Sequence, residues 1–118
     1  MADFAIFVGW GDVITGREQQ ATRVFGETME YFGRLQQKGE IVSIEPFFLE
    51  PHGGDLNGFF LARGEQDALT RIRNSEEFGR VILRATMVVE HVGVVAATTG
   101  QELNRQLGEF QQSAAELA

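Results

Sequence analysis

The chain has 118 residues, 43% of them hydrophobic and 10 of them phenylalanine, which is enough for a single domain spanning residues 1–118 with a core of its own. The absence of cysteine excludes disulfides, thiolate metal sites and thiol nucleophiles. The net charge is −7 and the Lys and Arg residues are scattered, so a nucleic-acid partner is not expected.

The N-terminus has no basic segment ahead of an apolar one. No apolar run approaches the roughly 20 residues of a membrane helix. We therefore expect a cytoplasmic protein without a membrane span.

A strand and a helix are predicted first. Residues 4–10 (FAIFVGW) are apolar on both alternating faces, as in a buried strand. Thr15 and Glu18 have the spacing of a capping box, which predicts a helix start. Apolar residues then recur at three- and four-residue steps, and Gly39 is placed to end the helix.

A β-hairpin is predicted in the middle of the chain. Two apolar runs, residues 41–49 and 57–63, lie on either side of the turn sequence Pro51-His52-Gly53-Gly54-Asp55. The sequence therefore predicts two consecutive antiparallel strands here.

Another helix and a last strand follow. A helical stretch opens after Gly64, and Asn74 with Glu77 repeats the capping pattern, so we expect a restart near Asn74. Residues 87–97 are dense in valine and predict a strand that includes Glu90 and His91 on opposite faces.

The C-terminal segment predicts a helix of a different kind. Thr99 and Glu102 have capping-box spacing. Apolar residues then follow alternate four- and three-residue steps, the narrow seam of a helix that docks on its own or a neighbouring subunit. The seam comprises Leu103, Leu107, Phe110, Ala114 and Leu117.

The first six elements have the order βαββαβ, the split βαβ arrangement of the α+β ferredoxin-like fold. Right-handed crossovers would place both helices on one face of a four-stranded antiparallel sheet of order 4-1-3-2. The other face would have no cover from its own chain unless the C-terminal helix folds beneath it.

This second sheet face is predicted to be apolar. Adjacent residues of a strand point to opposite sides, so one member of Phe47-Phe48 and one of Phe59-Phe60 must face away from the helices. Each large apolar side chain left in water forgoes roughly 1.5–3 kcal/mol. We expect a homodimer with its sheets face to face, and the C-terminal helix as cover in cis is the alternative.

Three segments resemble the YCII-related branch of the dimeric α+β barrel superfamily. They are residues 31–41 (YFGRLQQKGEI), residues 58–64 (GFFLARG) with Ala68-Leu69, and residues 75–78 (SEEF) before the valine-rich strand. The resemblance implies a ferredoxin-like subunit, a barrel formed by two sheets, and a small pocket for cofactor-free isomerase, monooxygenase or binding roles.

The sequence departs from this branch at the residues that would carry proton transfer. The resemblance implies a pair suited to proton transfer, a His in the first helix and an Asp after the second helix begins. Residues 16–38 contain no His, and the corresponding place is near Thr28. The Asp-Pro step of the relatives appears as Glu76-Glu77. That acid/base pair is therefore not transferable.

His52, with Glu50 and Asp55 nearby, could bind a divalent metal or act as base and orienter. The alternative is an ordinary turn, because Pro51 and two glycines fix the chain direction and Asp55 suits a turn hydrogen bond. The spacing matches no metal motif, so no metal is assigned.

Glu45, Arg63 and His91 each interrupt an apolar strand, and on one sheet face they would form a polar cluster in an apolar cavity. The alternative is a Glu45–Arg63 ion pair with His91 as a hydrogen-bonded core residue. Trp10 and Tyr31 could each stack on a flat ligand, and the alternative is that they are core or interface anchors.

No glycine run has P-loop or dinucleotide spacing, and no cofactor is expected. We therefore expect a protein that binds a small apolar or aromatic molecule, and the resemblance implies that such a protein can act on it as a cofactor-independent isomerase or monooxygenase. The alternative is a non-catalytic oligomerising module without a pocket. A void of roughly a few hundred cubic ångströms with Glu45, Arg63 or His91 on its wall would favour the enzyme, and the lack of any enclosed space would exclude it.

Overall fold

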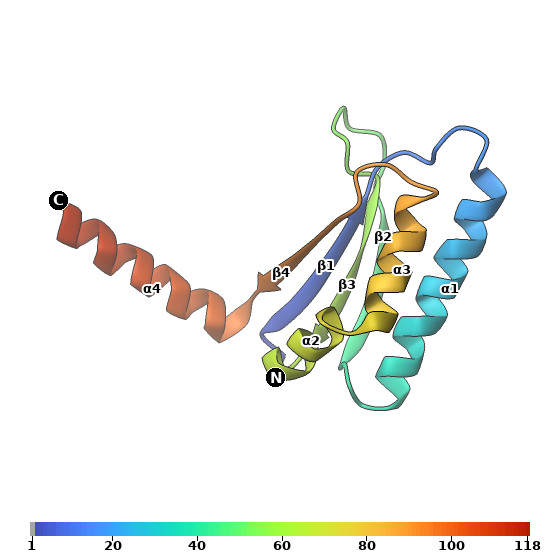
Figure 1. Ribbon diagram of the computed structural model, residues 1–118. Coiled ribbons are helices and arrows are strands. Elements are labelled where there is room, and N and C mark those ends of the chain that lie inside the picture. The colour runs from blue at the N-terminus through green and yellow to red at the C-terminus, as the bar shows by residue number, and fades with distance from the viewer. Residues whose placement is uncertain (1) are drawn as a thin grey trace.

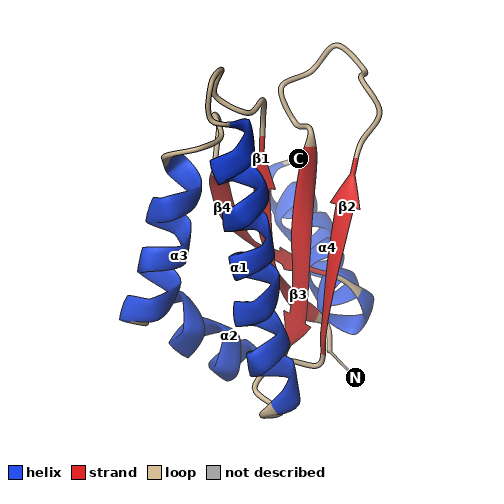
Figure 2. Ribbon diagram, turned by 90° about the vertical axis from the view of Figure 1, so that its right-hand side faces the viewer, coloured by secondary structure: helices blue, strands red, loops and turns tan. Residues whose placement is uncertain are grey.

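The computed structural model describes residues 2–118. Its elements are β1 (Phe4–Trp10), α1 (Glu18–Gln37), β2 (Ser43–Phe48), β3 (Gly58–Gly64), α2 (Gln66–Arg73), α3 (Glu76–Thr86), β4 (Gly93–Thr98) and α4 (Gly100–Leu117). The strands form one antiparallel sheet of order β2-β3-β1-β4, the predicted order read from its other edge. Helices α1, α2 and α3 cover one face of it (Figures 1 and 2). The predicted ferredoxin-like architecture is thus confirmed.

The core lies between this helix layer and the two central strands, β1 and β3. Ile6 pairs with Ala62 across these strands, and both side chains point to the helices, with 1% of each residue exposed. Phe32 of α1 packs onto them and is fully buried. Strands β1 and β3 are the central strands of the sheet, and they carry apolar side chains on both of its faces.

The opposite sheet face is open and apolar, as predicted. The rings of Phe7, Phe59 and Phe47 stack across β1, β3 and β2, with centroids 4.8 and 4.6 Å apart. Phe48 and Phe60 point to the helix side. No helix of the described residues covers this open face.

None of the three predicted capping boxes forms as expected. At α4, Thr99 is the N-cap, but its side chain makes no capping hydrogen bond. The N-cap of α1 is Arg17, whose side chain makes no capping hydrogen bond, so Thr15 does not cap it. The predicted restart near Asn74 does occur. However, the cap of α3 is Ser75, whose Oγ accepts a hydrogen bond from the amide of Phe78 at 3.2 Å.

The predicted strand over residues 87–97 is also wrong in its first half, because β4 begins only at Gly93. Residues 88–90 pair instead with the loop after β1. The amide of Gly11 donates to the carbonyl of Glu90 at 2.7 Å, and the amide of Ile14 donates to that of Val88 at 2.9 Å. His91 then adopts a left-handed φ of 57°, which turns the chain into β4.

Helix α4 projects away from the rest of the molecule on the open side of the sheet (Figure 1). None of its residues is buried, so the alternative in which it covers its own sheet is wrong. Among residues 2–118, no helix is both long enough and apolar enough to cross a bilayer.

Candidate functional site

A cavity of about 520 Å³ lies between the sheet and the N-terminal half of α1, and α3 forms its far side. This volume is within the range of small-molecule sites. The wall includes residues of β1, β2, β3, α1, α3 and the loops after β1 and α3. They are Val8, Gly9, Trp10, Val13, Glu18, Ala21, Thr22, Val24, Phe25, Thr28, Phe48, Phe60, Val81, Ile82, Ala85, Val88, Val89 and Val92.

The cavity exists because several side chains that face the sheet are smaller in the N-terminal part of α1 than near its C-terminal end. Near its C-terminal end, Tyr31, Phe32 and Leu35 fill the space above the sheet and are almost fully buried. One to three turns earlier, the cavity-lining positions carry Ala21 and Thr28, which are too small to reach the sheet. The gap between α1 and the sheet is therefore filled at the C-terminal end of α1, whereas in its N-terminal half Phe25 reaches Phe60 of the sheet and space is left beside it.

One wall of the cavity is aromatic. Trp10 contacts the rings of Phe60, Phe25 and Phe48, at centroid distances of 5.1, 6.2 and 6.2 Å. Phe25 stacks on Phe60 at 5.2 Å. Such a cluster offers flat surfaces to a planar ligand.

Few polar groups reach the cavity. The hydroxyl of Thr28 is buried and donates to the carbonyl of Val24 at 2.8 Å, and that of Thr22 donates to the carbonyl of Glu18 at 3.1 Å. Each hydroxyl oxygen keeps acceptor capacity for a ligand. Glu18 is the single acidic or basic side chain on the wall, and its carboxylate accepts a hydrogen bond from the amide of Gly16.

Of the candidate ligand-binding residues predicted from the sequence, Trp10 alone lines this cavity, and its wall includes none of Glu45, Arg63 and His91. Glu45 and Arg63 do meet, with Nε and Oε1 3.3 Å apart, as a part-exposed ion pair. Arg63 pairs with Ala5 at one end of β1, whereas His91 lies beyond the other end. The structure therefore does not bring the three polar residues together.

His52 is held within its own turn. Its Nε2 lies 2.7 Å from the carbonyl oxygen of Leu56, and its Nδ1 accepts from the amide of Gly54. The carbonyl of Asp55 and the ring of His91 both approach Gly11, where a Cβ atom would lie 2.9 and 3.0 Å from them. Within residues 2–118, no three His, Asp or Glu residues are grouped closely enough to hold a metal ion.

Tyr31, the other proposed ligand-stacking residue, belongs to the core, where its ring lies 5.1 Å from that of Phe32. The cavity walls on α1 and α3 were assigned from the sequence to core stripes. On α1 the signal is the small size of Ala21 and Thr28 in a stripe that otherwise carries large residues such as Phe25 and Phe32.

Solved structures of similar shape share the ferredoxin-like fold. A dimeric protein of unknown function from Bacteroides fragilis NCTC 9343 is 13% identical with a TM-score of 0.58, and the match covers 81% of this chain and 96% of that one. SnoaB, a cofactor-independent oxygenase from Streptomyces nogalater, is 19% identical with a TM-score of 0.56, covering 84% and 95%. A DABB family protein from Mesorhizobium loti MAFF303099 is 11% identical with a TM-score of 0.65, covering 83% and 98%.

No protein-family model and no curated protein matches the sequence. The likeness to the solved structures is one of fold. It leaves 16–19% of the 118 residues unmatched.

Proposed function

We propose that this protein binds a small, flat, largely apolar molecule in the cavity between α1, α3 and the sheet. The observation that carries the proposal is the cavity itself, about 520 Å³ with an aromatic wall formed by Trp10, Phe25, Phe48 and Phe60. Burial of about 200 Å² of apolar ligand surface would contribute about 5 kcal/mol before the entropic cost of association. An oligomerising module without a pocket does not account for this space.

Trp10 provides the assay, because it is the single tryptophan of the chain. Titration with 1-naphthol or menadione is expected to change Trp10 emission saturably. Ala21→Phe, which fills the cavity, is expected to weaken binding at least tenfold. Ala115→Phe, at an exposed position of α4 outside its apolar seam, is the matched control and should bind like the wild type. Equal binding by both variants would place the ligand elsewhere, and no saturable change with either compound would refute the proposal.

A cofactor-independent oxidation is the second candidate, favoured by the shared fold with the oxygenase SnoaB. In such a reaction the substrate supplies the electrons. For 1,4-naphthalenediol the balance is loss of two protons and two electrons to O₂, giving the quinone and hydrogen peroxide.

Glu18 is the candidate base for this reaction, since it is the ionisable group on the cavity wall. Oxygen uptake above the uncatalysed rate is expected, and Glu18→Gln should reduce it at least tenfold while 1-naphthol binding persists. Uptake equal to the protein-free rate would leave binding as the function.

We also propose that the chain forms a homodimer through the open sheet face. Phe7, Phe47 and Phe59 support this, as does Val95, which is 53% exposed at the centre of β4. Val95→Glu would place like charges in the interface and is expected to give monomers in sedimentation. Leu83→Glu, at a similarly exposed site on α3, is the control and should stay dimeric. A monomeric wild type at micromolar concentration would overturn the dimer.

Two finer assignments remain proposals. We place the chain in the YCII-related branch on its residues 31–41, 58–64 and 75–78, and in the cytoplasm on its lack of cysteine and its acidic composition. Localisation of a tagged full-length chain by fluorescence microscopy tests the second assignment.

A further inference from the structure

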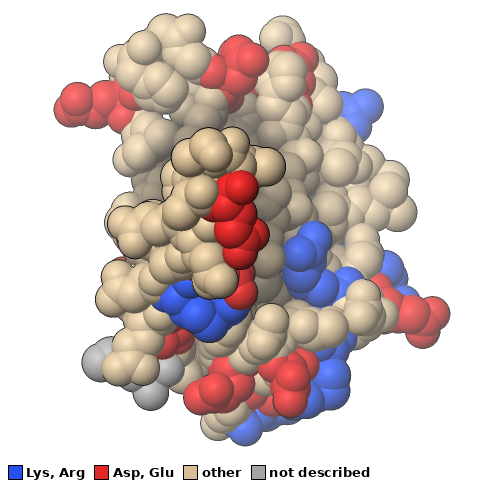
Figure 3. Space-filling model, turned by 90° about the vertical axis from the view of Figure 1, so that its left-hand side faces the viewer, with Lys and Arg blue, Asp and Glu red and all other residues tan. Residues whose placement is uncertain are grey.

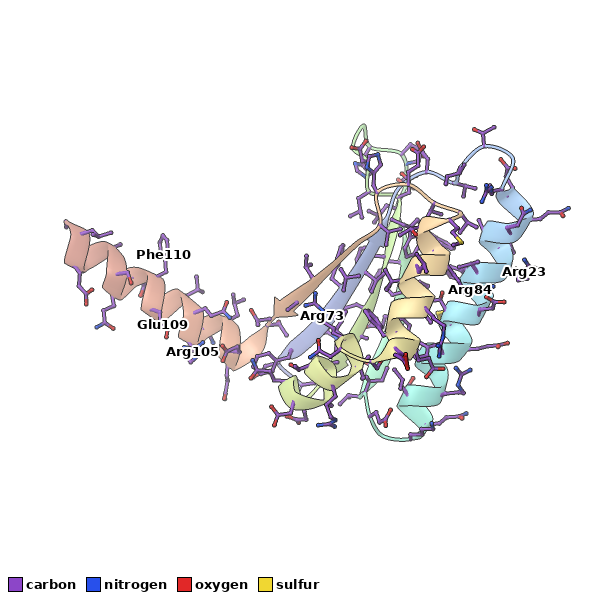
Figure 4. All side chains as sticks on the ribbon, in the orientation of Figure 1. Arg23, Arg73, Arg84, Arg105, Glu109 and Phe110 are labelled. Atoms are coloured by element: carbon purple, nitrogen blue, oxygen red, sulfur yellow. The ribbon has the colours of Figure 1, made fainter. Side chains whose placement is uncertain are left out.

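The described part of the chain leaves two apolar surfaces uncovered, and α4 carries one of them. Leu103, Leu107, Phe110 and Leu117 are 41–88% exposed. Arg105 pairs with Glu102 and Glu109, both at 2.6 Å, on the other side of the helix, so the apolar seam is free of charge (Figure 4). An isolated helix of this length is marginal in water, so α4 needs a surface to pack on.

The junction between β4 and α4 directs the helix away from its own sheet. Gly100 has a φ of 62°, and a Cβ atom there would lie 2.5 Å from Oδ1 of Asp3. The amide of Thr99 donates to the carbonyl of Asp3 at 2.9 Å, which fixes the start of the helix. Helix α4 therefore projects from the open side of the sheet at a defined angle (Figure 1).

We infer that α4 is an arm that packs on a second copy of this chain, along the β2 edge of the partner's sheet. The inference rests on the homodimer proposed above. A sheet stacked on the open face would lie about 10 Å away. Helix α4 has 18 residues and so reaches about 27 Å, far enough to pass that sheet.

The surface area that a stable dimer buries also supports a second copy of this chain as the partner of α4. Four strands of about seven residues present about 400 Å² of open face. Half the surface of α4 adds about 470 Å². A standard interface takes about 800 Å² from each partner, which neither surface supplies alone and the two supply together.

Of the two edges of the sheet, the one formed by β2 exposes more large apolar side chains. Val42, Phe48 and Leu49 are 59, 74 and 37% exposed there, whereas the β4 edge has Val95 alone among the large exposed hydrophobics of the described residues. Around the projecting α4, the surface in Figure 3 is mostly neither acidic nor basic. Phe48 also forms part of the cavity wall, so the arm would cover the outer side of the ligand site of its partner.

Photo-crosslinking tests this arrangement directly, because the full chain contains no cysteine. Gln111→Cys beside the seam is labelled with benzophenone maleimide, and ¹⁴N and ¹⁵N proteins are mixed before irradiation. Mixed-isotope crosslinks from position 111 to residues 42–49 are expected. Gln112→Cys, on the opposite side of the helix, is the control and should give at least fivefold fewer. Crosslinks within one copy, between two α4 helices or to the β4 edge would each overturn the inference.

Sedimentation separates the arm from the sheet interface. Phe110→Glu is expected to raise the dimer dissociation constant at least tenfold, and Gln112→Glu to leave it within twofold of the wild type. An unchanged constant for Phe110→Glu in a dimeric protein would refute the arm and leave the sheet dimer standing. A monomeric wild type would remove both.

Discussion

Replacement of Gly58 by alanine tests how tightly the aromatic wall of the cavity is fixed. Gly58 pairs with Trp10 across β1 and β3. A Cβ atom there would lie 2.5 Å from Cζ2 of Trp10 and 2.6 Å from the carbonyl oxygen of Phe47. The indole can yield only by moving against the rings of Phe60, Phe25 and Phe48 that it contacts, and the carbonyl oxygen belongs to the neighbouring strand β2. Both shifts strain the sheet beside the cavity.

The expected cost is about 1–3 kcal/mol, typical of overpacking. For 118 residues at about 2.1 cal/mol/K each, the unfolding entropy is about 0.25 kcal/mol/K, so Tm should fall by about 4–12 °C. Gly26→Ala is the control, since a Cβ atom there meets nothing within 4 Å in the middle of α1. It should gain about 0.5–1 kcal/mol and raise Tm by about 2–4 °C.

Thermal unfolding followed by circular dichroism measures both shifts, and Trp10 emission reports movement of the indole. Opposite signs for the same chemical change are the test of the steric argument. If Gly58→Ala melts within 2 °C of the wild type, or if both variants shift Tm in one direction, the packing described at Trp10 is incorrect.

Burial raises the pKa of Tyr31, so the folded state keeps this phenolic proton above pH 10 where the unfolded chain releases it. The free energy of unfolding should therefore fall as pH rises above 10. Ionisation of this single tyrosine, followed by its absorbance at 295 nm, should have a midpoint above pH 10. A midpoint at or below pH 10 would contradict the burial. Ser75→Ala removes the acceptor for the amide of Phe78 and should cost about 1 kcal/mol in urea unfolding, and no change would mean that the cap is not used. Arg63→Ala should cost less than about 1 kcal/mol, because Arg63 and Glu45 are both more than one third exposed, and a larger loss would mean that the pair is buried in an assembly.

The architecture could be predicted because its signals are local and redundant. Two-sided apolar strands such as residues 4–10 must be central in a sheet, and the order of strands and helices then leaves few topologies. The same reasoning identified the open face correctly from Phe47-Phe48 and Phe59-Phe60. Helix starts were predicted less well, because the spacing of a polar residue and a glutamate at Thr15 and Asn74 does not reveal which residue adopts the cap geometry.

The predicted strand was wrong over residues 87–92 because of a tertiary contact. Valine-rich residues 87–92 have the composition of a strand, but their hydrogen-bonding partners are the backbone groups of Gly11, Asp12 and Ile14 in the loop after β1. That contact forms only once β1 and α3 are in place, so it leaves no mark on the local pattern. The cluster expected from Glu45, Arg63 and His91 depended on this strand and is not formed.

The cavity and the arm follow from one property of the sequence, the uneven distribution of large side chains. On α1 the large residues are concentrated in the C-terminal half, and Thr28 stands where bulk would be needed to close the layer. On α4 large apolar residues such as Phe110, 72% exposed, face no part of their own chain. A packed layer with a gap and a helix without a partner are both costly in isolation. Their coexistence in one chain is explained if a ligand occupies the first and a second copy receives the other.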